Sequence, residues 1–138
     1  MRPSNRDVIA LLTAIGLGLA SVCLPVVILQ LPLAPDGLFP FIFAGVEGMS
    51  SLTLILLFTS GLILGLIFSI HPLHPLVFGF ATMAAFPALA FVEMAQNPYS
   101  HNLWPFEFAI YGLVSLLAVG GAYAGRALRQ IAHRRSRS

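Results

Sequence analysis

Apolar residues fill long, uninterrupted stretches of this chain, and polar residues gather between these stretches and at the two ends. A helix that crosses a bilayer needs about 20 mostly apolar residues. Four stretches satisfy that requirement, at residues 8–30, 51–70, 76–95 and 106–128. The pattern therefore predicts an all-α integral membrane protein, with four transmembrane helices in an antiparallel bundle.

The composition excludes the other broad classes of protein. Of the 138 residues, 58% are hydrophobic and 9% are charged, compared with about 25% charged residues in a typical soluble domain. A soluble chain of this length has too little interior to bury so much apolar surface, and disordered chains are polar and rich in charge. We expect residues 1–130 to form a single membrane domain that retains its first stretch, and residues 131–138 to form a disordered basic tail.

The arginines indicate which side of the membrane holds the chain ends. Positively charged flanks of membrane spans stay on the cytoplasmic side. Both termini are therefore expected in the cytoplasm, and the protein in the plasma (cytoplasmic) membrane. This threading places the four acidic residues between the ends on the outer face. The seven arginines are Arg2, Arg6, Arg126, Arg129, Arg134, Arg135 and Arg137, and the four acidic residues are Asp36, Glu47, Glu93 and Glu107.

The first outer connection, residues 31–50, combines a turn signal with a short aromatic run. The sequence Pro35-Asp36-Gly37 is typical of a turn. The run Phe39-Pro-Phe-Ile-Phe43 is apolar but too short to cross a bilayer. We therefore expect a short interfacial or re-entrant segment here.

Small residues on the predicted spans indicate how the helices associate. Membrane helices pack through close contacts between small residues, because lipid is as apolar as leucine. Two spans carry a Gly-x-x-x-Gly motif, formed by Gly61 with Gly65 and by Gly121 with Gly125. We expect these glycines to pack the bundle internally, and the alternative is a face that binds a second copy or another protein.

Two of the predicted spans contain a proline, and no span has an acidic or basic side chain near its middle. Pro25 and Pro87 each remove one helical hydrogen bond and are expected to kink the first and third helices. Ion pathways and proton relays usually place an ionisable group at depth. The absence of such a group near the middle of any span disfavours proton-coupled transport.

The densest polar segment, residues 93–107, connects the third and fourth spans at the outer face. Glu93 and Glu107 should lie at similar depth there, and Glu47 should reach the same level. These carboxylates and His101 could together bind a divalent cation such as Mn²⁺ or Zn²⁺, or act as an acid/base pair. The binding candidates are Glu47, Glu93, Asn97, His101, Asn102 and Glu107, and the metal-ligand candidates are Glu93, His101 and Glu107.

The same segment also has a structural interpretation. Asn102 is a good N-cap residue, and Glu107 near the start of the next helix interacts favourably with the helix dipole. Glu93 lies within an apolar run, where an unpaired carboxylate would be costly. A network of polar contacts that stabilises the loop therefore remains an alternative to a binding site.

The sequence favours a non-enzymatic membrane protein, acting as a structural or assembly subunit through its glycine faces and outer polar hairpin. One alternative is a carrier or channel for small solutes or ions that works as an oligomer. Another is a membrane enzyme or metal-binding protein with an outer Glu/His site. No cofactor is evident apart from the candidate divalent metal. The expected partners are membrane lipid and either further copies of the chain or a larger membrane complex, but not nucleic acid.

Overall fold

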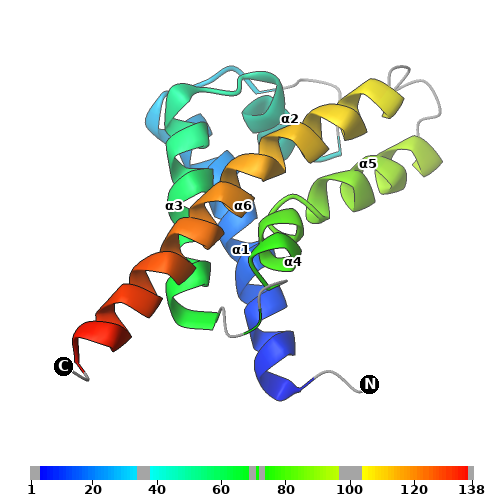
Figure 1. The fold of residues 1–138 in the computed structure, drawn as a ribbon. Helices are drawn as coiled ribbons and strands as arrows, with labels where there is room; N and C mark the ends of the chain where they lie inside the picture. Colours follow the sequence, from blue (N-terminus) through cyan, green and yellow to red (C-terminus); the bar gives the residue numbers. More distant parts are fainter. Residues whose placement is uncertain (1–3, 34–37, 69–70, 72–73, 97–103, 137–138) are drawn as a thin grey trace.

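The computed structural model describes residues 4–33, 38–68, 71, 74–96 and 104–136. In this part of the chain all regular secondary structure is α-helical (Figure 1). The helices are α1 (Asn5–Ile28), α2 (Pro40–Glu47), α3 (Ser51–Phe68), α4 (His74–Ala81), α5 (Ala85–Gln96) and α6 (Trp104–Arg135).

Four helical segments are long and apolar enough to cross a membrane, namely Asn5–Ile28, Ser51–Phe68, His74–Gln96 and Pro105–Arg135. The prediction of an all-helical protein with four such segments is confirmed. The fourth segment continues as a helix to Arg135, into the range 131–138 that the sequence suggested as a disordered tail.

The start of α1 follows directly from its sequence. The Ser4 side chain accepts a hydrogen bond from the backbone N–H of Asp7 at 3.2 Å, and the Asp7 carboxylate accepts one from the backbone N–H of Ser4 at 3.1 Å. This reciprocal pair is a capping box, which satisfies N–H groups that the first helical turn leaves without partners.

The third span is interrupted where the sequence predicts a kink. Residues 82–84 form a turn between α4 and α5, and Pro87 lies in the first turn of α5. A proline ring clashes with the carbonyl four residues earlier and has no N–H to donate to it, and that carbonyl belongs to Met83. Instead, the Phe86 N–H donates to the Met83 carbonyl at 3.2 Å. By contrast, α1 continues as a helix through Pro25.

The two Gly-x-x-x-Gly motifs face each other across the interface between α3 and α6. This interface is the most extensive contact between two of the described helices. A Cβ atom at Gly61 or Gly65 would overlap a backbone carbonyl of α6, and one at Gly121 or Gly125 would overlap a backbone carbonyl of α3. The four glycines are buried. Their lack of side chains therefore allows the two backbones to touch.

Other segments of the chain make similarly close approaches. A Cβ at Gly18 of α1 would overlap the Thr82 carbonyl in the turn between α4 and α5, and a Cβ at Gly79 of α4 would strike Val119 of α6. Two buried apolar clusters fill the space between the helices. One contains Ala10, Ala14, Leu64, Phe78 and Ala81, and the other contains Val22, Leu57, Met83, Phe86 and Tyr111.

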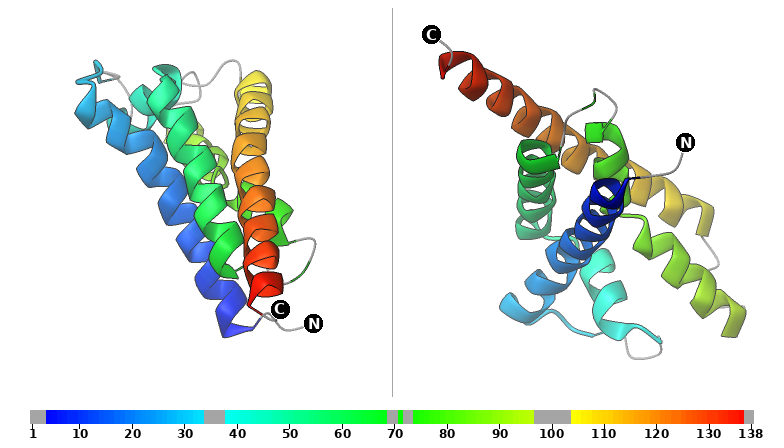
Figure 2. Two further views of the ribbon diagram at one scale, coloured as in Figure 1. Left: turned by 60° about the vertical axis from the view of Figure 1, so that its left-hand side comes forward. Right: turned by 90° about the horizontal axis from the view of Figure 1, so that it is seen from below.

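The two ends of the molecule differ in charge. Both termini lie at the lower end in Figure 1 and in the left view of Figure 2, and this end carries the arginines of α1 and α6. We call it the arginine end. The opposite end, formed by α2, the last part of α5 and the first part of α6 (Figure 1), holds Glu47, Glu93 and Glu107. We call it the acidic end.

Candidate functional site

Three helices place one glutamate each at the acidic end. Glu47 is the last residue of α2 and is exposed, and Glu107 lies in the first turn of α6 and is half-buried. Glu93 lies on α5, and only 5% of its surface is exposed. The three carboxylates therefore differ in their access to solvent, although they belong to the same end of the molecule.

Tyr111 lies at the same end of the molecule as these glutamates. It follows Glu107 by one helical turn on α6, and its side chain is 3% exposed. Its ring lies with its centroid 6.0 Å from those of Phe86 and Phe108. All three glutamates, Glu47 among them, are near enough to act on Tyr111 electrostatically. Two of the three predicted carboxylates, Glu47 and Glu107, line one cavity together with Tyr111.

Tyr111 is not among the site residues predicted from the sequence, although the sequence contains a signal for it. Residues four positions apart lie on the same face of a helix, so Glu107 and Tyr111 share one face of α6. A tyrosine one helical turn after a candidate carboxylate is therefore a candidate for the same site.

A cavity of about 240 Å³ lies between α2 and α6 at the acidic end. Known ligand pockets usually measure about 300–1,000 Å³, so this cavity suits a small group. Its lining combines two carboxylates with aromatic and aliphatic side chains. The lining residues are Phe43, Val46, Glu47, Glu107, Ile110 and Tyr111.

The remaining predicted site residues, Asn97, His101 and Asn102, lie outside the described residues. The metal prediction from Glu93, His101 and Glu107 depends on one of them. Among the residues that the structure describes, no group of three or more histidine, cysteine, aspartate or glutamate side chains could hold a metal ion. A divalent metal therefore stays a prediction from the sequence.

At the arginine end, two cations meet the last turn of α3. The Arg6 guanidinium donates to the Ile67 carbonyl at 3.0 Å, and the Arg129 guanidinium donates to the same oxygen at 3.3 Å. Cations are favourable at a helix C-terminus because carbonyls there carry partial negative charge. These contacts link α1, α3 and α6 at one level.

The buried hydroxyls between the two ends bond to groups inside the protein. The Ser21 and Ser60 hydroxyls lie 2.9 Å apart and join α1 to α3. The Thr82 hydroxyl donates to the Gly79 carbonyl at 2.7 Å. These bonds stabilise helix contacts and turns, and they do not trace a polar path across the molecule.

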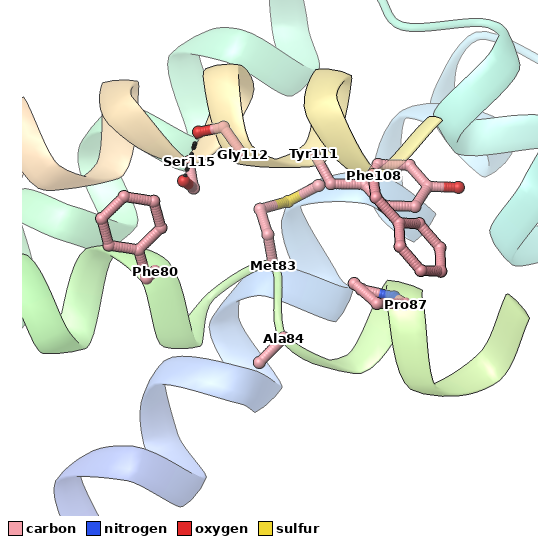
Figure 3. Close-up of a pocket in the computed structure, with 8 residues that line it drawn as sticks. All are labelled: Phe80, Met83, Ala84, Pro87, Phe108, Tyr111, Gly112 and Ser115. Carbon is pink, nitrogen blue, oxygen red and sulfur yellow. Dashed lines mark hydrogen bonds between the residues drawn. The ribbon is translucent and has the colours of Figure 1, made fainter. Parts of the chain in front are cut away.

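A second hollow, of about 170 Å³, lies between the interrupted third span and α6 (Figure 3). Figure 3 shows the Met83 side chain extending from the turn towards α6, and the Tyr111 hydroxyl pointing away from Met83. The Ser115 hydroxyl donates to the Gly112 carbonyl at 2.6 Å, so its donor is already used. The remaining lining is largely apolar, formed by Phe80, Ala84, Pro87 and Phe108. This hollow therefore suits hydrocarbon rather than a polar ligand.

Comparisons with models of protein families, with curated proteins and with solved structures found no match for this chain. What the protein does is therefore argued from its own residues and their geometry.

Proposed function

We propose that this chain is a small integral protein of a plasma membrane whose four spans run antiparallel, with both termini in the cytoplasm. The separation of charge supports this orientation. Both termini lie at the arginine end (Figure 1), and cationic flanks remain on the cytoplasmic side. The acidic end then faces outward, with α2 as the interfacial segment.

Within that membrane, the protein acts without catalysis as a structural or assembly subunit, and its contact surface is the acidic end. The observation that carries the choice of the acidic end over the glycine faces is the burial of all four motif glycines between α3 and α6. Because these glycines pack against this chain's own backbone, they offer no close approach to a partner helix. The surface left for contact with a partner is the acidic end, where Glu47 is exposed and Glu107 is half-buried.

Neither alternative function has comparable support. A carrier or channel would use a polar path, whereas the buried serine pair of α1 and α3 is hydrogen-bonded within the protein. A metal-dependent or catalytic role would draw on Glu93, Glu107 and His101, and elemental analysis of the purified protein tests its metal-binding form directly.

Purification from native membranes tests the assembly role. The full chain, expressed at its native level and extracted in a mild neutral detergent, is expected to elute with a stoichiometric partner protein or as a defined oligomer. Replacing Glu47 and Glu107 with glutamine should release the partner while the chain itself remains folded. The control is Asp7→Asn, which removes one negative charge at the arginine end. A monomer that elutes alone, with and without the substitutions, would contradict the proposal.

A further inference from the structure

The Tyr111 side chain is almost completely buried, yet its hydroxyl has no hydrogen bond to another residue in the described part of the chain. The hydroxyl oxygen of Tyr111 is not among the fully buried polar atoms that lack a partner, so it keeps some accessible surface and is open to a group from outside the chain. Tyr111 lines the cavity between α2 and α6. The cavity therefore contains a polar group that a ligand can satisfy.

The charge of the same cavity is negative. Glu47 and Glu107 both line it, and Glu93 is near enough to act on Tyr111 electrostatically. The sequence has no arginine or lysine between Asp7 and Arg126. The arginines thus lie in the first and last parts of the chain, and the carboxylates favour a cationic ligand.

The remaining lining favours an organic cation over a metal ion. Phe43, Val46 and Ile110 contribute hydrocarbon to the cavity wall, whereas hard divalent cations require oxygen ligands on most sides. An alkylammonium group has a charged head and an apolar body. Its head can pair with carboxylates, its body can contact the aliphatic side chains, and aromatic faces attract such cations.

We propose that the cavity between α2 and α6 binds a primary alkylammonium group. Glu47 and Glu107 pair with its charge, and the Tyr111 hydroxyl accepts a hydrogen bond from one of its N–H groups. Val46 and Ile110 contact its carbon chain. The site shares Glu47 and Glu107 with the proposed contact surface, and alkylammonium binding is therefore measured on the isolated chain, without a partner protein. Such a group is supplied both by soluble amines and by the headgroup of phosphatidylethanolamine.

Titration of the delipidated full chain in neutral detergent with n-butylammonium tests the site, with 1-butanol as the uncharged analogue. We expect n-butylammonium to bind and 1-butanol not to bind. Glu47→Gln should weaken n-butylammonium binding about fivefold, as expected for loss of an exposed ion pair. Asp7→Asn, which removes a charge at the other end, should leave the affinity unchanged.

Tyr111→Phe separates the hydrogen bond from the aromatic contact. It should weaken n-butylammonium binding about tenfold, because a hydrogen bond with a charged donor is lost. Tetramethylammonium has no N–H group, so its affinity should not change on this substitution. Glu47 is exposed, so Glu47→Gln is expected to fold normally, and an unchanged gel-filtration profile verifies this for each variant.

Three results would overturn the proposal. They are the absence of n-butylammonium binding to the wild-type chain, equal binding of 1-butanol, and unchanged affinity in the folded Glu47→Gln variant.

Binding measured in lipid nanodiscs then distinguishes whether the amine comes from a lipid headgroup or from a soluble molecule. If phosphatidylethanolamine discs weaken n-butylammonium binding relative to phosphatidylcholine discs, which are also zwitterionic but have no N–H group, the lipid headgroup occupies the site. Equal affinity in both discs assigns the site to a soluble amine. Both outcomes support the ligand class.

Discussion

Gly120 and Gly121 are neighbours on α6 but have opposite surroundings. A Cβ at Gly121 would overlap the Phe58 carbonyl of α3, whereas a Cβ at Gly120 would meet nothing within 4 Å. The sequence does not distinguish the two positions, because both are glycines in an apolar helix. At the scale of single residues, the effect of adding one methyl group is therefore decided by the position of the neighbouring backbone.

We expect Gly121→Ala to destabilise the protein by about 2 kcal/mol, because the added carbon forces α3 and α6 apart and overpacking costs of this size are typical. The neighbouring Gly120→Ala provides the matched control. It should be neutral or stabilising by up to about 1 kcal/mol, because alanine favours a helix over glycine. Thermal unfolding in detergent, followed by circular dichroism, measures both. Equal effects of the two substitutions would show that the α3–α6 contact is not as close as described.

At the scale of elements, α1 and α3 are joined by a buried polar contact. The Ser21 hydroxyl donates to the Leu17 carbonyl at 2.7 Å within α1 and lies 2.9 Å from the Ser60 hydroxyl of α3. Both serines are buried. The contact fixes the relative position of two helices whose other neighbouring residues are mainly apolar.

A double-mutant cycle with Ser21→Ala and Ser60→Ala measures the strength of this contact. We expect a coupling free energy of about 0.6 kcal/mol, the average for hydrogen bonds between membrane helices. The readout is the free energy of unfolding in mixed micelles for the two single variants, the double variant and the wild type. Strict additivity of the two single effects would argue against a direct hydrogen bond between the hydroxyls.

At the scale of the whole molecule, the proposed orientation rests on the two differently charged ends. Arg6 and Arg129 both contact the end of α3 at the arginine end, and Glu47 is exposed at the acidic end. Burying cations or carboxylates in the hydrocarbon region is costly. The most favourable placement therefore keeps each end at a membrane surface.

Cysteine labelling on intact cells tests this orientation. After Cys23→Ala removes the natural thiol, a membrane-impermeant maleimide should label Ser51→Cys at the start of α3. It should not label Ser136→Cys, which follows the end of α6, until the membrane is permeabilised. Both serines are exposed, so access depends on the side of the membrane. The reverse pattern, or labelling of both cysteines before permeabilisation, would refute cytoplasmic termini.

The sequence by itself determined the number of long apolar helices and the separation of arginines from carboxylates along the chain. These features are local, because each depends on the composition of about 20 consecutive residues. The sequence also indicated Pro87 as a point of distortion, since proline blocks a specific helical hydrogen bond.

Only the tertiary structure decided which residues meet. The motif glycines pack between α3 and α6, although their spacing equally allowed a surface for a second chain. The cavity that joins Glu47 and Glu107 to Tyr111 forms because α2, which packs on α1, comes near the start of α6, more than fifty residues away in the chain. Such approaches depend on how side chains from distant segments fill space together, and the hydropathy pattern contains no information on that packing.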